Sequence, residues 1–248
     1  MYKKFNCYRA GLKISGHIHK KKSGRLPAVI LCHGFMANEL TCYAYAKVLA
    51  GLGYAAFTFD FCGGGITSRS DGKTENMSVA TELRDLEAVY EYVKNSKYVD
   101  PSHISVLGCS QGGLVSAIFA AKHREIKNLI LFYPALCIPD DAKKGEMLGF
   151  KFDTSNIPDP VSKFPMRIGK CYVEAVINMD YKSAISGYDG NTILIHGTAD
   201  NIVNISYARS AKDLYSSCHY HEIEGGGHMF FGKHQIEAIR ILKQEMAI

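Results

Sequence analysis

Apolar runs alternate with stretches of helical periodicity along most of the chain. Residues 2–8 and 12–19 alternate in polarity and predict an opening pair of strands. Continuous apolar runs predict strands buried on both faces at 26–32, 54–60 and 128–133, and further strands are predicted at 105–108, 192–196 and 218–223. Between them, helices are predicted near 38–51, 78–93, 113–122, 205–216 and 234–246. This alternation predicts an α/β fold, with a mostly parallel central sheet flanked by helices.

The alternation stops between Pro134 and about Tyr188. Prolines are frequent in this stretch, and no strong strand pattern is present. Since it follows a sheet strand, the stretch predicts a small cap, or lid, over the carboxyl ends of the strands. We therefore expect a core formed by residues 1–133 and 188–248 and a cap insertion formed by 134–187.

Two finer expectations concern the first third of the chain. His17 and His19 share one face of a strand, and without a third ligand nearby they predict a polar outer face better than a metal site. Asn38 is expected to cap the first helix. The apolar side of that helix is predicted to carry Leu40, Tyr43, Ala44, Val48 and Leu49.

Composition and charge exclude several classes of protein. Hydrophobic residues make up 47% of the 248 positions, charged residues make up 21%, and the net charge is only +5. The one dense basic run, at 20–22, abuts Ser23 and Gly24 and predicts a solvated turn, so no nucleic-acid partner is expected. No apolar run reaches membrane-spanning length, and no signal sequence is recognised. The eight cysteines show no C-x-x-C spacing, which predicts free thiols in the cytoplasm.

A candidate nucleophile follows the strand that ends at Gly108. The motif Gly108-Cys109-Ser110-Gln111-Gly112 lies between that strand and a helical run. Gly-x-Ser-x-Gly in this context is the nucleophile elbow, where the serine is strained and the glycines let strand and helix pass closely. The Gly-x-Ser-x-Gly pattern also occurs by chance in ordinary strand-helix turns. The assignment of Ser110 as a nucleophile therefore needs support from the rest of the chain.

A serine hydroxyl needs a base to accept its proton, and the base needs a carboxylate to hold its tautomer. In this architecture the order is serine, acid, histidine, each after a strand. Asp200 follows the strand at 192–196, and His228 lies in the glycine-rich loop after the strand at 218–223. Other acids and histidines near them lie inside predicted elements or before a strand. The predicted catalytic triad is Ser110, Asp200 and His228.

Backbone amides are expected to stabilise the oxyanion of the tetrahedral intermediate. One amide belongs to Gln111, directly after the nucleophile, and the other to Phe35, after the strand at 26–32. His33 is predicted to form structural hydrogen bonds. No metal or organic cofactor is expected, and the glycines at 63–65 lack the spacing of a dinucleotide-binding loop.

With these motifs the chain resembles the α/β hydrolases over essentially its whole length. The general motifs lie at 33–35, 108–112, 196–200 and 227–228. The segments at 71–77, 145–159 and 169–173 resemble the bacterial cinnamoyl/feruloyl esterases most closely. Two departures could reshape the rim of the pocket. Glycines at 63–65 replace the family's Gly-His-Gly, and Cys109 replaces the histidine of its elbow.

The resemblance also implies roles for the cap. In that family the cap covers an aromatic acyl group, and cap residues contact its ring hydroxyls. Asp141 and Tyr172 match those positions, although Tyr172 can equally be a core aromatic of the cap. The resemblance further implies a homodimer.

Together these observations predict a serine esterase that acts on a small-molecule ester through an acyl-enzyme. The resemblance to the cinnamoyl/feruloyl esterases implies a hydroxycinnamate such as ferulate as the acyl group. A short-chain carboxylesterase and a monoacylglycerol lipase are the nearest alternatives. A peptidase and a non-catalytic binding module with the same fold are further alternatives.

Overall fold

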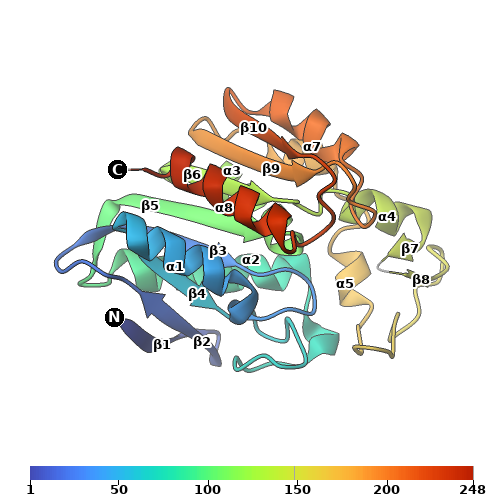
Figure 1. Cartoon of the computed structure of the whole chain (residues 1–248). Helices are drawn as coiled ribbons and strands as arrows, with labels where there is room; N and C mark the ends of the chain where they lie inside the picture. The colour runs from blue at the N-terminus through green and yellow to red at the C-terminus, as the bar shows by residue number, and fades with distance from the viewer. Residues whose placement is uncertain (148, 248) are drawn as a thin grey trace.

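Eight strands form the central sheet of the structure, a computed structural model that describes residues 1–147 and 149–247 (Figure 1). They are β1 (Tyr2–Arg9), β2 (Leu12–His19), β3 (Leu26–Cys32), β4 (Ala55–Phe59), β5 (Val99–Cys109), β6 (Asn128–Phe132), β9 (Asn191–Gly197) and β10 (Ser217–Ile223). Their spatial order is β1-β2-β4-β3-β5-β6-β9-β10. Neighbours from β4 to β10 pair in parallel, and β1 and β2 extend the sheet in antiparallel fashion. The predicted mostly parallel sheet is confirmed.

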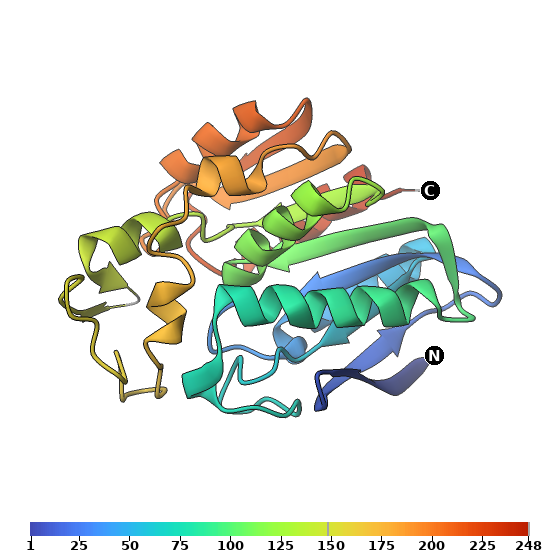
Figure 2. The same ribbon diagram turned by 180° about the vertical axis from the view of Figure 1, so that it is seen from behind.

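Helices cover both faces of this sheet, which explains why its inner strands are apolar along their whole length. One face packs against α1 (Tyr43–Leu52) and α8 (Lys233–Glu245), which lie in front in Figure 1. The opposite face, seen in Figure 2, is covered by α2 (Val79–Lys94), α3 (Gln111–Lys122), α6 (Tyr181–Ile185) and α7 (Ser206–Ala211). At the start of α2, Ser78 and Thr81 form a reciprocal capping box.

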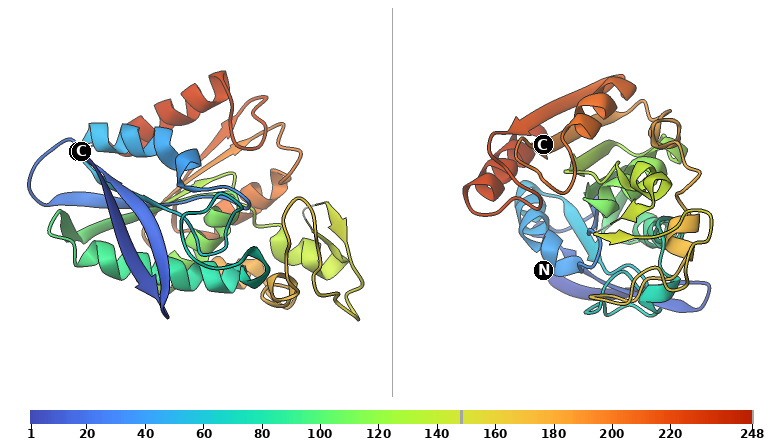
Figure 3. Two further views of the ribbon diagram at one scale, coloured as in Figure 1. Left: turned by 90° about the horizontal axis from the view of Figure 1, so that it is seen from below. Right: turned by 90° about the vertical axis from the view of Figure 1, so that its right-hand side faces the viewer.

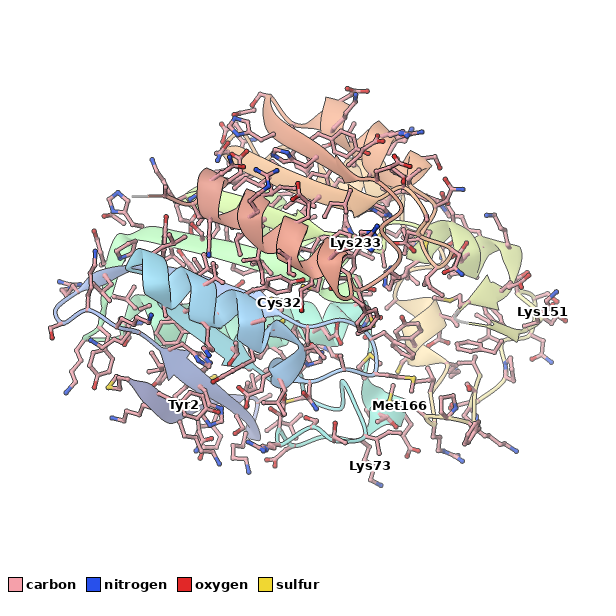
Figure 4. All side chains as sticks on the ribbon, viewed as in Figure 1. Tyr2, Cys32, Lys73, Lys151, Met166 and Lys233 are labelled. Carbon is pink, nitrogen blue, oxygen red and sulfur yellow. The ribbon has the colours of Figure 1, made fainter. Side chains whose placement is uncertain are left out.

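The segment between β6 and β9 projects from the end of the sheet, away from the β1–β2 hairpin (Figure 3). It contains α4 (Ile138–Lys144), a small hairpin of β7 (Glu146–Met147) and β8 (Phe150–Lys151), and α5 (Cys171–Glu174). Lys151 lies at the outer margin of the molecule (Figure 4). The last helix before β9, α6, packs against α3 of the sheet-covering layer. The segment therefore leaves the sheet at β6 and returns to it beneath α3.

The prediction for the apolar side of the first helix is wrong at two positions. Asn38 does form a cap, but of a 3₁₀ turn (Glu39–Cys42) that precedes α1. A 3₁₀ turn has three residues per turn instead of 3.6, which changes the phase of the faces before the α-helix begins. Leu40 and Tyr43 are consequently exposed, and the buried positions are Cys42, Tyr45, Ala46, Leu49 and Ala50.

The two strand histidines are buried, so the predicted polar outer face is also wrong. The strand β2 has neighbours on both sides, and the 3₁₀ turn and β4 each supply a polar partner. His17 Nδ1 lies 2.6 Å from Glu39 Oε1, and His19 Nε2 lies 3.1 Å from Thr58 Oγ1. Burial lowers the pKa of His19 to about 4, so this ring is neutral at pH 7.

One further difference concerns the length of a helix, whereas the prediction of free cysteines is confirmed. The predicted helix at 205–216 is divided into α7 and a 3₁₀ turn (Lys212–Leu214). All eight cysteines are free thiols. Within residues 1–147 and 149–247, no helix combines the length and apolar character needed to cross a membrane.

Candidate active site

Ser110 occupies a sharp turn between β5 and α3. Its φ of 53° and ψ of −121° are strained for a residue other than glycine. A Cβ on Gly108 would lie 2.2 Å from Gly112 O, and one on Gly112 would lie 2.3 Å from His33 O. Only glycine fits at these two positions, as the elbow motif requires. The turn lifts the Ser110 hydroxyl clear of the sheet.

The structure brings Ser110, His228 and Asp200 into one hydrogen-bonded row. His228 Nε2 lies 2.9 Å from Ser110 Oγ, and His228 Nδ1 lies 2.8 Å from Asp200 Oδ2. Since a carboxylate only accepts hydrogen bonds, Nδ1 carries the proton and Nε2 is free to accept that of the serine. Ser110, Asp200 and His228 follow β5, β9 and β10, respectively, at the carboxyl edge of the sheet, where the chain order predicted them.

Asp200 is held by more partners than the row requires. Its Oδ1 accepts the backbone amides of Ile202 and Val203, both at 2.9 Å, and its Oδ2 lies 3.2 Å from His196 Nε2. Burial raises the pKa of Asp200, but the hydrogen bonds from His196 and His228 and the Val203 amide outweigh burial and hold the pKa well below its usual range. Asp200 is therefore a carboxylate throughout the physiological range of pH.

Tyr133 packs against the His228 ring and Phe230 packs against Tyr133, and the sequence analysis identified neither residue. The Tyr133 ring meets the His228 ring edge to face, with centroids 4.8 Å apart. Phe230 is fully buried and packs against Tyr133 at 4.9 Å. Both residues have positive φ values, 38° and 47°. Tyr133 directly follows β6, and this position at a strand end was the only available signal.

The two predicted oxyanion residues lie beside Ser110. Gln111 is the first residue of α3, and Phe35 lines the same cavity as Ser110. A Cβ on Gly34 would lie 3.0 Å from Ser110 Cβ, so the loop after β3 approaches the nucleophile closely. His33 fixes this loop as predicted, because its Nδ1 lies 2.8 Å from Gly34 O and its Nε2 accepts the Phe61 amide at 3.1 Å.

A cavity of about 450 Å³ opens next to Ser110, a volume typical of small-molecule sites. Its wall combines apolar residues with three charged ones, Asp141, Lys144 and Glu146. Asp141 Oδ1 lies 3.7 Å from Lys144 Nζ. The structure thus places Asp141 at the cavity. Within the described residues, no group of three His, Cys, Asp or Glu side chains could hold a metal ion.

Tyr172, the other predicted substrate contact, is not part of the cavity wall. It lies on α5 and is fully buried. Its hydroxyl donates a hydrogen bond to the side-chain oxygen of Gln111. Its ring lies 5.7 Å from the Phe35 ring, measured between centroids. The alternative interpretation, a buried aromatic residue, describes the position that Tyr172 has in this structure.

Glu82 lies behind the elbow, on the buried side of α2. Among the described residues, neither of its carboxylate oxygens has a hydrogen-bond partner. Burial raises the pKa of Glu82 to about 8. The nearby Gln111 amide, which does not reach hydrogen-bonding geometry with either oxygen, opposes this increase in part, and the charge of Asp85 adds to it. Glu82 is therefore mostly protonated at neutral pH.

We expect Glu82→Gln to flatten the pH dependence of stability between pH 5 and pH 8. Glu82 titrates near 4.5 when unfolded and near 8 when folded, so the folded state binds the extra proton. Wild-type stability is therefore complete below pH 4.5 and falls by up to about 5 kcal/mol as the pH rises through 8. Chemical unfolding at pH 5, 6.5 and 8 measures the slope. Glu91→Gln, on the exposed side of α2, is the control, and equal slopes in both variants would contradict the prediction.

The sheet, the elbow and the row of serine, histidine and aspartate define an α/β hydrolase. The chain belongs to the family described as serine aminopeptidase, S33, whose model matches residues 25–160. A structure described as ferulic acid bound to Est1E from Butyrivibrio proteoclasticus is similar over 98% of this chain and 97% of that one, with a TM-score of 0.91 and 29% identity. The resemblance to the α/β hydrolases is confirmed.

Curated sequences match over shorter stretches. The uncharacterized protein YcjY of Escherichia coli is 33% identical over 101 residues, which are 40% of this chain and 32% of that protein. A relative from Aquifex aeolicus is 29% identical over 133 residues, which are 50% of this chain and 57% of that protein. The chain therefore matches less than two thirds of the length of either relative.

Proposed function

We propose that this protein is a serine carboxylic-ester hydrolase that acts through an acyl-enzyme. The observation that carries the proposal is the row of hydrogen bonds from Ser110 Oγ through His228 to Asp200, at 2.9 Å and 2.8 Å, next to a cavity of about 450 Å³. Such a row converts a serine hydroxyl into a nucleophile. The cavity offers the space that an acyl group needs.

The mechanism has two matching halves. Ser110 Oγ attacks the ester carbonyl while His228 Nε2 takes its proton, and Asp200 stabilises the imidazolium that forms. The backbone amides of Phe35 and Gln111 donate to the oxyanion. The alcohol leaves with the proton from His228. Water then attacks the acyl-enzyme by the same route and releases the acid.

For the acyl group we propose a hydroxycinnamate of the ferulate type. The similarity to Est1E, whose structure is described with ferulic acid bound, supports this choice. The cavity supports it as well, because apolar side chains such as Ile138 and Met147 could pack against an aromatic ring, and Asp141 could accept a hydrogen bond from a ring hydroxyl. The proposed location of the acyl group is therefore the cavity beneath α4.

The test compares kcat/KM for methyl ferulate, p-nitrophenyl butyrate, a monoacylglycerol and an amino-acid p-nitroanilide. We expect methyl ferulate to exceed the other substrates by at least about tenfold, the worth of one good hydrogen bond to a charged group. Preference for an aliphatic ester would support the proposed esterase activity but contradict the proposed hydroxycinnamate acyl group. Preference for the anilide would support the peptidase, and no turnover at all would support a binding module.

Asp141→Asn refines the test. It is expected to lower kcat/KM for methyl ferulate about tenfold and to leave methyl cinnamate, which has no ring hydroxyl, nearly unchanged. Asp140→Asn is the matched control, because Asp140 is the adjacent residue on α4, accepts a hydrogen bond from Tyr207 at 3.1 Å and is not part of the cavity wall. Equal losses for both esters would contradict a role of Asp141 in recognising the hydroxyl.

A further inference from the structure

We propose that Tyr172 is a positioning residue that braces the oxyanion hole, so that its hydroxyl acts on turnover of every ester and not on recognition of one acyl group. The inference rests on the proposed esterase function. It assigns Tyr172 a role different from the substrate contact that the resemblance implies. The argument depends on what Tyr172 touches, on what holds Tyr172 in place, and on what would happen to Gln111 without it.

Tyr172 contacts the side chains of both residues whose backbone amides are proposed to bind the oxyanion. Its hydroxyl donates to Gln111 Oε1, and its ring packs against that of Phe35 at an interplanar angle of 51°. Gln111 and Phe35 come from different loops, at the start of α3 and after β3. Tyr172 is thus a direct link between two separate segments whose relative position determines the spacing of the two donors.

The helix α5, which carries Tyr172, is itself tied to the chain just before α2. Cys171 Sγ lies 3.3 Å from Glu75 O, and a Cβ on Gly169 would lie 2.2 Å from the same oxygen. Thr74 Oγ1 donates to Arg167 O at 2.7 Å, and Arg167 Nε lies 2.7 Å from Glu75 Oε2. These contacts join α5 to the 3₁₀ turn Thr74–Asn76. These contacts therefore hold α5, and with it Tyr172, in a fixed position.

The Gln111 side chain depends on this contact. Gln111 is fully buried, and its Nε2 lies 3.7 Å from Met77 Sδ, a weak acceptor. Its Oε1 accepts from the Tyr172 hydroxyl. Without that hydroxyl a buried amide oxygen would lose its partner, which favours rotation of the side chain and displacement of the first residue of α3. That residue carries one of the two proposed oxyanion donors.

Direct recognition of substrate by Tyr172 fits these contacts less well. The side chain is fully buried, is not part of the cavity wall, and already uses its hydroxyl proton for Gln111. A ring hydroxyl of the substrate could reach it only after this hydrogen bond was broken. The two roles predict different kinetics, which makes them separable.

The decisive experiment is Tyr172→Phe, assayed with methyl ferulate, methyl cinnamate and p-nitrophenyl acetate. We expect kcat to fall about tenfold for all three esters, with KM changed less than twofold, because the lost hydrogen bond supports the transition state. A loss confined to methyl ferulate and seen in KM would overturn the inference and restore the substrate contact. An unchanged kcat for all three esters would also overturn it.

Controls separate a positioning role from loss of structure and from failure of the proposed function. Tyr188→Phe removes the hydroxyl of another buried tyrosine, one that donates to Ile126 O at 2.9 Å, and should leave kcat unchanged. Gln111→Met should reproduce the loss in kcat, and adding Tyr172→Phe to it should cost nothing more. Losses that multiply would overturn the link. A wild-type protein that hydrolyses no ester would reject the proposed function itself.

Discussion

Ser110→Ala is expected to lower kcat for the best ester substrate by roughly 10⁴- to 10⁶-fold, the largest effect of any single substitution in this chain. The alanine removes the only hydroxyl within hydrogen-bonding distance of His228 Nε2 among the described residues. Water would then have to attack the ester directly, with no acyl-enzyme. The remaining activity would come from binding and from the backbone amides at the oxyanion hole.

The fold should survive this change. Ser110 forms the turn through its backbone, because its amide donates to Phe132 O at 3.0 Å and its carbonyl accepts the Ala135 amide at 2.9 Å. A fluorophosphonate probe should label the wild type and fail to label Ser110→Ala. Ser116→Ala, at a buried serine on the same helix, is the control and should keep both labelling and activity. Labelling of Ser110→Ala would show that the nucleophile has been assigned to the wrong residue.

Asp200→Asn should lower kcat by roughly 10³- to 10⁴-fold, the second largest effect. The amides of Ile202 and Val203 donate to Oδ1, so the asparagine oxygen is expected to keep that position. The NH₂ group would then face His228 Nδ1, which could only accept. The proton of the ring would move to Nε2, and His228 could no longer take the proton of Ser110.

This prediction has a structural consequence that must be measured beside it. His196 Nε2, at 3.2 Å from Asp200 Oδ2, would face the same NH₂ group, so we expect a lower melting temperature as well as lower activity. Assays at 15 °C below the new melting temperature separate the two effects. Asp213→Asn, in an exposed 3₁₀ turn, serves as the control for an added amide. Activity within tenfold of the wild type would contradict the assigned orientation of His228.

The sequence predicted the sheet and the positions around it because those features depend on local patterns. Buried parallel strands are apolar throughout, and the elbow needs glycines at 108 and 112 for steric reasons that any chain must meet. Ser110, Asp200 and His228 were found by combining chain order with strand ends. In the structure His228 lies 2.9 Å from Ser110 and 2.8 Å from Asp200, measured between the hydrogen-bonding atoms. Their catalytic roles remain predictions.

What the sequence did not predict depends on contacts between distant segments. Tyr133 was not identified, because its ring meets that of His228, which lies far away in the sequence. Tyr172 could not be placed, because its partner Gln111 lies 61 positions away. The phase of α1 was wrong because a 3₁₀ turn precedes it. In each case the periodicity of the sequence describes a single helix or strand, whereas the position of the residue depends on the neighbouring elements.

The position of the segment between β6 and β9 bears on how such enzymes diversify. These two strands are hydrogen-bonded neighbours, with Leu129 opposite Thr192 and Phe132 opposite Ile195. The chain therefore departs from the sheet and rejoins it at the adjacent position. Evolution can lengthen, shorten or exchange the excursion without changing the strand pairing that holds Ser110 and Asp200. The pairing of β6 with β9 therefore does not depend on the length of the segment between them. If the proposed function holds, we expect exchange of residues 134–180 to change the substrate preference and to leave the sheet intact.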